Sequence, residues 1–467
     1  MLFSGIPFLY YFLPAVLLVY FSVPRRAKNI ILLLFSLFFY FYGEPVFVLL
    51  LLFSSLTGYL AGLLVDKHGK TGPGKAALWG AVVINLLLLG FYKYADFFIA
   101  NINALFNTSI KLLHLPLPLG ISFFVFQTIS YVVDVYRGDA PADKNPLDFT
   151  MYVAMFPQLV AGPIIRYTTV AGQIRGRKHT FDGFASGVGR FVTGLAKKVL
   201  IADALGALSA TMLATTAPTV LSYWLAIFAY ILQIYFDFSG YSDMAIGLGR
   251  MFGFDFPENF NYPFIANSIS DFWRRWHISM GAWFREYLYI PLGGNRVSRL
   301  KWVRNIFIVW FATGLWHGAN WNYILWGLYF GVLLGIEKLF MGKLLKKTPG
   351  WLRHVYTLGL VFFSFIIFYI ESLPAMFSHI SGMFGGLGLS GANVESIYYL
   401  KSYGLLLAAA CIGATPLLKN WAARLLENKR TAPVMQVLQP VFYLVLLVVT
   451  TGYLVDSSFS PFLYFRF

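Results

Sequence analysis

The sequence predicts an all-α polytopic membrane protein, and three observations support this fold class. Hydrophobic residues make up 58% of the 467 residues, charged residues only 12%, and the mean hydropathy is +0.67. So few charges cannot cover the surface of a water-soluble protein of this size. The apolar residues also gather into runs of about 15–22, long enough for a helix to cross a hydrocarbon core. The composition therefore excludes a soluble globular enzyme, a disordered chain and a fibrous chain.

The apolar runs predict about 10–12 transmembrane helices in a single membrane domain over residues 1–467. The runs cover residues 5–23, 29–43, 46–65, 76–94, 117–136, 219–238, 305–319, 321–341, 355–371, 401–419 and 437–455. The stretch 147–205 contains prolines and then becomes amphipathic around Lys197 and Lys198, which predicts re-entrant or interfacial helices. The segment 255–300 is too polar to face lipid.

The chain has 36 Lys+Arg against 20 Asp+Glu, a formal net charge of +16. Its basic residues stand in short loops between apolar runs, which indicates membrane orientation and not a nucleic-acid partner. These loops contain Arg25, Arg26 and Lys28; Lys67, Lys70 and Lys75; Arg296, Arg299, Lys301 and Arg304; Lys338, Lys343, Lys346, Lys347 and Arg353; and Lys419, Arg424, Lys429 and Arg430. If all of them are cytoplasmic, both termini lie on the extracytoplasmic side of the cell membrane. The first apolar run lacks a basic n-region and a cleavage site, so we expect a retained span.

The chain has one cysteine, Cys411, and it lies in an apolar run. A single cysteine excludes an internal disulfide framework and a zinc-thiolate site. We expect its side chain to pack as a small hydrophobe, and we expect no metal site.

Polar side chains in apolar surroundings are informative in a membrane protein, because burying them is costly. The segment from Asp271 to Gly294 mixes arginines and His277 with tryptophans and tyrosines. On a continuous helix, Arg274, His277 and Gly281 would share one face. An interfacial helix with an aromatic belt and snorkelling arginines is the alternative to a functional site.

His317 ends one apolar run and is followed by Gly318 and a second run. An imidazole between two apolar helices is a functional candidate, and it exchanges protons near neutral pH. Gly314 and Gly318 would allow another helix or a ligand to approach closely. The alternative is a buried histidine that bonds to a backbone carbonyl.

A third polar cluster closes the apolar run that ends near residue 238, and it contains Asp237 and Asp243. These acids could orient a histidine or pair with arginines. Equally, a helix could end at Gly240, with the cap of the next helix following it.

Together these segments resemble the membrane-bound O-acyltransferases, and most closely the branch that acetylates alginate and related extracellular polysaccharides. The matching stretches begin at Pro118 (Pro-Leu-Gly-Ile-Ser-Phe-Phe), Ser130, Phe156, Tyr235, Trp273 and Trp316 (Trp-His-Gly), and the two ends of the chain also match. The Trp-His-Gly tripeptide is unspecific alone, but it is specific in combination with the earlier tryptophan-arginine-histidine block. The resemblance spans nearly the whole chain.

The resemblance implies a curved ring of helices around a central tunnel, with re-entrant or interfacial helices and a catalytic core over about residues 117–341. The family's catalytic histidine matches His317, and a second functional histidine matches His277. Acetyl-CoA is the implied donor, bound from the cytoplasm, and no permanently bound cofactor is expected. The implied partners are the lipid bilayer, a polysaccharide acceptor and an extracytoplasmic acetyltransferase of the SGNH type.

The C-terminal aromatic tail, residues 462–467, resembles a motif whose tyrosine relays the acyl group, and that tyrosine would be Tyr464. The loop charges place this tail outside, as a relay requires. An aromatic anchor at the membrane interface is the alternative.

CoA is polyanionic and cannot enter hydrocarbon, whereas an acetyl group is small and neutral. Basic side chains near the inner face would therefore attract the phosphates of the donor. The expected donor- and substrate-binding residues are Arg274, Arg275, Trp276, Arg285, Trp316, Asn320 and Asp237. We expect His317 to act as general base on the attacking hydroxyl, and His277 to position the substrate or stabilise the oxyanion.

Three other functions fit parts of the pattern. A transporter or channel would show paired acids within spans and inverted repeats, and we find no repeat. An inactive scaffold would not need both His277 and His317. A D-alanyl transferase of the teichoic-acid type, with a carrier-protein thioester as donor, is the runner-up within the resembled family.

Overall fold

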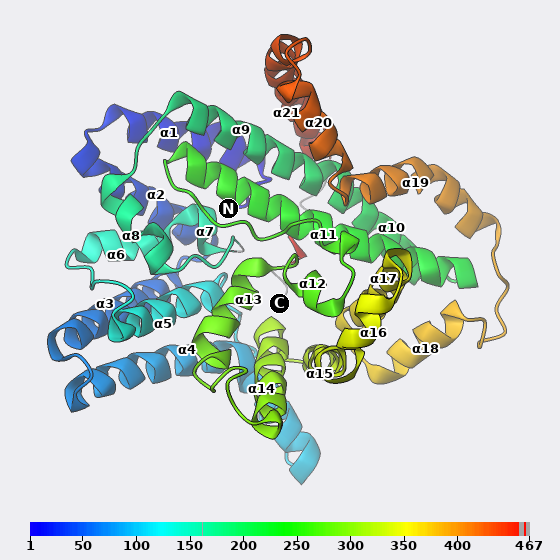
Figure 1. The fold of residues 1–467 in the computed structure, drawn as a ribbon, viewed down its shortest axis with the longest axis horizontal. Helices are drawn as coiled ribbons and strands as arrows, with labels where there is room; N and C mark the ends of the chain where they lie inside the picture. Colours follow the sequence, from blue (N-terminus) through cyan, green and yellow to red (C-terminus); the bar gives the residue numbers. More distant parts are fainter. Residues whose placement is uncertain (161, 457–461, 464–467) are drawn as a thin grey trace. The chain divides into compact units, whose positions relative to one another are not determined.

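A computed structural model describes residues 1–160, 162–456 and 462–463, and within these ranges the regular structure is entirely helical (Figure 1). The chain forms two compact units. Unit 1 contains residues 1–191 and 242–257, and unit 2 contains residues 192–241 and 258–463. Two long helices, α9 and α11, contribute residues to both units.

Unit 1 begins with a π-helical turn at Phe8–Phe12 that continues as α1 (Leu13–Ser22). Its other helices are α2 (Lys28–Gly43), α3 (Val48–His68), α4 (Gly72–Phe106), α5 (Ile121–Arg137), α6 (Pro146–Ala154), α7 (Phe156–Leu159), α8 (Tyr167–Gly176) and the first part of α9 (Phe181–Ala196). The apolar helices α3, α4 and α5 pack against one another (Figure 1). The short helix α7 is buried along its whole length, and six of the nine residues of α6 are buried.

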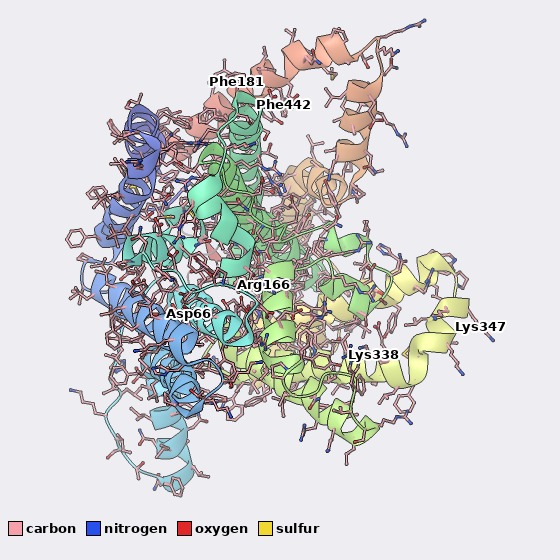
Figure 2. The ribbon with its side chains drawn as sticks, turned by 60° about the vertical axis from the view of Figure 1, so that its left-hand side comes forward. Asp66, Arg166, Phe181, Lys338, Lys347 and Phe442 are labelled. Carbon is pink, nitrogen blue, oxygen red and sulfur yellow. The ribbon has the colours of Figure 1, made fainter. Side chains whose placement is uncertain are left out.

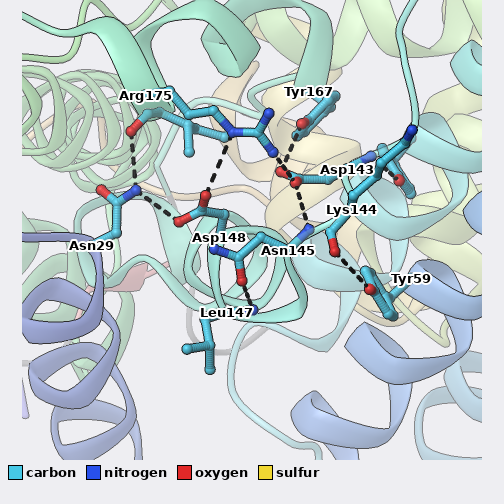
Figure 3. Close-up of polar contacts among 11 residues, drawn as sticks. Asn29, Tyr59, Asp143, Lys144, Asn145, Leu147, Asp148, Tyr167 and Arg175 are labelled. Atoms are coloured by element: carbon cyan, nitrogen blue, oxygen red, sulfur yellow. Dashed lines mark hydrogen bonds and ion pairs between the residues drawn. The ribbon is translucent and has the colours of Figure 1, made fainter. Parts of the chain in front are cut away.

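A polar network joins α2, α8 and the chain before α6 inside unit 1 (Figure 3). The buried carboxylate of Asp143 accepts hydrogen bonds from the Tyr167 hydroxyl at 2.8 Å and from Arg175 at 2.5 Å. Asp148 accepts one from Asn29 at 2.8 Å. The network therefore adds polar contacts that hold three segments of unit 1 together.

Unit 2 contains most of the second half of the chain. Its elements are the π-helical segment η3 (Lys197–Ala202), α10 (Asp203–Ala214), α11 (Val220–Met251), α12 (Ile269–Trp273), α13 (Ile278–Phe284), η5 (Arg285–Tyr289), α14 (Arg299–His317), α15 (Trp321–Ile336), η6 (Glu337–Met341), α16 (Gly342–Lys347), α17 (Gly350–Tyr369), α18 (Leu373–Met383), α19 (Val394–Gly413), α20 (Leu417–Glu427) and α21 (Ala432–Asp456). The helices α14 and α15 form a hairpin, and α17 packs against α15.

The prediction of a polytopic all-α membrane protein is confirmed. Every predicted apolar run overlaps a helix, and seven helices of the described chain are long and apolar enough to cross a membrane. These are α3, α4, α11, α15 with its extension to Lys347, α17, α19 and α21. Apolar side chains such as Phe442 on α21 remain exposed, whereas Lys338 and Lys347 lie on the surface between α15 and α17 (Figure 2). Such apolar surface indicates contact with lipid.

The alternative that a helix ends at Gly240 is wrong. Helix α11 runs without interruption from Val220 to Met251. A side chain at Gly240 would collide with the backbone around Gly194 and Lys198. Glycine is therefore needed here for close packing between helices, and not as a helix terminator.

Candidate active site

Three residues predicted to belong to the site come together in unit 2. The ring centroid of Trp316 lies 5.8 Å from that of His277 and 5.1 Å from that of His317. His277 is 0% exposed and His317 is 4% exposed. One indole therefore contacts both imidazoles in a buried setting.

His277 occupies the break between α12 and α13. Its backbone is left-handed, with φ 45° and ψ 53°, which is uncommon for a residue other than glycine. Such a conformation persists only where the surroundings enforce it. The prediction of a shared helix face for Arg274, His277 and Gly281 is therefore wrong, because the helix is interrupted at His277.

Asn259 holds the His277 ring and fixes its tautomer. The Nδ1 atom of His277 lies 3.2 Å from Oδ1 of Asn259, and the backbone N–H of Ser279 donates to the same oxygen at 3.2 Å. Because a backbone N–H can only donate, this Asn259 atom is the carbonyl oxygen, and Nδ1 of His277 must carry the hydrogen. In the neutral ring, Nε2 is then the nitrogen with the lone pair.

Burial keeps this imidazole neutral. His277 lies outside the seven candidate spans, and desolvation lowers its pKa to about 3. The ring also packs edge to face on Phe238 of α11, with centroids 4.7 Å apart. His277 is thus a buried imidazole held on one side by Asn259 and on another by the ring of Phe238.

His317 is the last residue of α14, at the turn into α15. Its ring makes edge-to-face contacts with Trp326 at 4.8 Å and Phe368 at 5.4 Å. Gly314 allows the turn to be tight, because a side chain there would collide with the backbone of Tyr323. The expectation that Gly314 admits a closely packed helix is confirmed.

The predicted arginines lie away from these contacts. Arg274 and Arg285 are exposed, and Arg285 has Glu286 at 3.9 Å. Arg275 forms an ion pair with Asp271 at 3.2 Å and also donates to the carbonyl of Asn261. The two exposed arginines therefore lie where an anionic ligand could reach them from solvent, whereas Arg275 braces the segment before His277.

Trp276 and Asn320 flank the histidines in sequence and differ in their surroundings. Trp276 is buried in an aromatic cluster with Phe260 at 5.1 Å and Phe365 at 5.5 Å. Asn320 is half-buried at the N-terminus of α15, and its side chain makes no cap hydrogen bond there. Trp276 therefore supports the fold around His277, and Asn320 lies in the turn that follows His317.

Asp237 does not orient either histidine through any hydrogen bond of the described residues. Its Oδ1 pairs with Nζ of Lys198 at 2.8 Å, and its Oδ2 accepts the backbone N–H of Leu463 at 2.8 Å. The adjacent residue, Phe238, is the one that contacts His277. Consecutive residues of α11 thus hold the C-terminal tail and a histidine ring.

Sequence reasoning missed several residues that shape this region, above all Asn259, Phe238 and Lys198. Asn259 gave no signal, because a lone asparagine in an irregular segment is unremarkable in sequence. Lys198 was noticed only as part of an amphipathic stretch, although a lysine in apolar surroundings implies a buried acid nearby. Tyr464 lies outside the described residues. Within the described ranges, no group of three or more His, Cys, Asp or Glu residues is arranged to hold a metal ion.

Comparison with known proteins places this site in a family context. Residues 140–379, which include His277 and His317, match the model of the membrane-bound O-acyltransferase family. A protein of Azotobacter vinelandii named probable alginate O-acetylase is 40% identical over 100% of both chains. A peptidoglycan O-acetyltransferase of Helicobacter pylori is 35% identical over 86% of this chain and 83% of its own.

A more distant relative covers a smaller part of the sequence. A teichoic acid D-alanyltransferase of Bacillus subtilis is 31% identical over 54% of this chain and 68% of its own length. The similarity to the two O-acetylating proteins extends further along the chain.

Proposed function

The chain belongs to the membrane-bound O-acyltransferase family and is an O-acyltransferase, and we propose that it moves an acetyl group from a cytoplasmic thioester, acetyl-CoA, toward an extracellular polysaccharide. The observation that carries the site assignment is the pair of buried imidazoles on Trp316. The acetyl group and the polysaccharide rest on the names of the relatives that match most of the chain.

In the proposed reaction a hydroxyl attacks the thioester carbonyl. Neutral His317 takes the hydroxyl proton as the new C–O bond forms, which is general-base catalysis. The C–S bond then breaks, and the departing thiolate recovers the proton from the imidazolium. The products are an acetyl ester and free CoA thiol, so His317 ends as it began.

His277 has a different role in this scheme. Two roles were open, oxyanion stabiliser or positioning group. With its hydrogen on Nδ1, neutral His277 offers a lone pair at Nε2, so it can accept a hydrogen bond but cannot stabilise an oxyanion. We therefore assign it to positioning the substrate, since the only hydrogen of the attacking hydroxyl is the one that His317 takes.

The donor must stay partly outside the membrane, because its phosphates are charged. Exposed Arg274 and Arg285 suit this task, since guanidinium groups bind phosphate in a bidentate manner. The acetyl arm would pass through a narrow tunnel to the histidines. This arrangement requires cytoplasmic access for the donor and extracytoplasmic access for the acceptor hydroxyl.

The attacking hydroxyl is proposed to be that of Tyr464. The acetylated tail would hand the group to an extracytoplasmic SGNH-type acetyltransferase, which would modify the sugar. The placement of both termini outside belongs to the same proposal, because the relay must meet that enzyme. A Tyr464→Phe variant removes only the hydroxyl, so normal polymer acetylation in this variant would leave the tail as an interface anchor.

A direct test uses inverted membrane vesicles that contain the full chain and radiolabelled donors. We expect label from acetyl-CoA to enter the protein or a lumenal acceptor, and we expect none from a D-alanyl carrier-protein thioester. The His317→Ala variant should insert normally and transfer nothing above background. Transfer from the carrier protein alone would favour the D-alanyl alternative, and full activity of His317→Ala would remove this histidine from the mechanism.

A further inference from the structure

The buried ion pair between Lys198 and Asp237 touches the C-terminal tail. Their side chains are 3% and 2% exposed, and their charged atoms lie 2.8 Å apart. Lys198 also reaches Asp203 at 2.7 Å, so two carboxylates balance its charge. An ion pair this deeply buried costs desolvation energy and is weak evidence for a stabilising role. Its burial therefore points to a role other than stabilising the fold.

The tail uses both members of this pair. The second oxygen of Asp237 accepts the backbone N–H of Leu463 at 2.8 Å. The ring of Phe462 is 1% exposed, lies 4.8 Å from Nζ of Lys198, and meets Tyr241 edge to face at 4.7 Å. Leu463 is thus held through its backbone N–H, and Phe462 is held through its aromatic ring.

The docking point lies beside the candidate active site along α11. Asp237 holds the tail and the next residue, Phe238, packs on His277. Side chains of successive helical residues diverge by about 100°, so the tail and the histidine lie on different sides of one rigid helix. Leu463 directly precedes Tyr464 in the sequence.

We propose that Lys198, Asp237 and Tyr241 form a docking site for the chain's own C-terminal tail, and that they are positioning residues which hold the tail for acyl transfer. Asp237 recognises the peptide group of Leu463, and Lys198 with Tyr241 recognises the aromatic ring of Phe462. The transfer step in this inference rests on the proposed function of Tyr464, whereas the docking itself does not.

Docking can be measured without transfer. In the full chain with Cys411→Ala, a Leu463→Cys change keeps the backbone N–H and introduces one thiol at the tail. Because Leu463 is half-buried in the docked tail, a rise in the rate of maleimide labelling in membranes reports a larger fraction of undocked tail. Because a hydrogen bond to a charged acceptor is lost, Asp237→Ala should speed labelling roughly tenfold or more.

The same chain offers a matched control. Asp148 of α6, whose side chain is 11% exposed, pairs with Arg175 of α8 at 3.6 Å and accepts a hydrogen bond from Asn29. Asp148→Asn therefore breaks an ion pair within unit 1 and should leave both labelling and transfer per folded molecule unchanged. Asp237→Glu retains the charge and should restore part of the wild-type behaviour.

Acetyl transfer supplies the second readout. Asp237→Ala and Lys198→Met should lower kcat while leaving KM for the donor unchanged, because the donor site is intact. Unchanged labelling in Asp237→Ala, or equally accelerated labelling in Asp148→Asn, would overturn the docking site. If Tyr464→Phe transfers normally while Asp237→Ala still labels faster, the relay fails and the docking site stands.

Discussion

The Asp143 network of unit 1 and the histidine site of unit 2 use buried polar groups in opposite ways. In unit 1, the Asp143 carboxylate is surrounded by donors, namely the Tyr167 hydroxyl, Arg175 and a backbone N–H (Figure 3). In unit 2, aromatic rings surround His317, and a neutral amide holds His277. The first arrangement surrounds a carboxylate with hydrogen-bond donors, whereas the second places two imidazoles among aromatic rings.

This contrast distinguishes polar groups that stabilise the fold from polar groups that can take part in a reaction. A carboxylate whose oxygens are fully used contributes to stability and has little capacity left for a substrate. A neutral imidazole has a lone pair that can take up a proton, which is what a general base must do. Substitutions should therefore affect stability in unit 1 and turnover in unit 2.

The largest effect is expected from the histidines themselves. His317→Ala should reduce acetyl transfer by about 10²–10⁴-fold, because it removes the general base. The double variant His277→Ala/His317→Ala should transfer acetyl groups only slightly more slowly than His317→Ala, since residues that act as a unit have non-additive effects. Steady-state rates of purified protein in detergent, alongside thermal unfolding curves that should coincide with wild type, test both statements. Additive losses would show that the two imidazoles work independently.

The next effect falls on stability. Asp143→Ala leaves the Tyr167 hydroxyl and Arg175 without their acceptor, and it should lower the free energy of unfolding by about 3 kcal/mol. Transfer per folded molecule should be unchanged. Asp66→Ala, at an exposed acid of the same unit, is the control and should leave the melting temperature unaltered. A turnover defect in Asp143→Ala at full stability would contradict the contrast.

A smaller effect concerns pH. Asn259→Asp places a carboxylate on Nδ1 of His277 and should raise the pKa of this imidazole from about 3 toward its usual range. As pH falls through that raised pKa, the ring becomes protonated and loses its lone pair. Activity of the variant should then drop roughly tenfold or more between pH 8 and pH 5 relative to wild type. If the pH–rate profiles of the variant and the wild type were parallel, His277 would not act as a hydrogen-bond acceptor in the reaction.

The smallest effect should come from the exposed side of the unit 1 network. The side chain of Arg175 is 62% exposed, so Arg175→Ala should cost less than about 1 kcal/mol. Chemical denaturation in detergent can resolve this difference from that of Asp143→Ala. A loss as large as that of Asp143→Ala would mean that the ion pair, and not the buried acceptor, holds unit 1 together.

The apolar runs predicted the helices because spacing and composition determine which segments can enter a membrane. The chemistry-bearing residues His277, His317 and Trp316 could also be found, since polar groups in apolar segments are conspicuous. The break at His277 could not, because it depends on the tertiary contact with Asn259. The partner of Asp237 could not be predicted either, since the sequence does not show that Lys198 of η3 faces Asp237 of α11.

The central claim is that the acyl group is transferred at the two imidazoles on Trp316. An experimental structure of the full chain with a non-hydrolysable thioether analogue of acetyl-CoA tests it most directly. The acyl carbonyl should lie within about 3–4 Å of the His317 ring, as a reacting arrangement requires. An acyl end bound elsewhere, with His317 and His277 beyond its reach, would contradict this account.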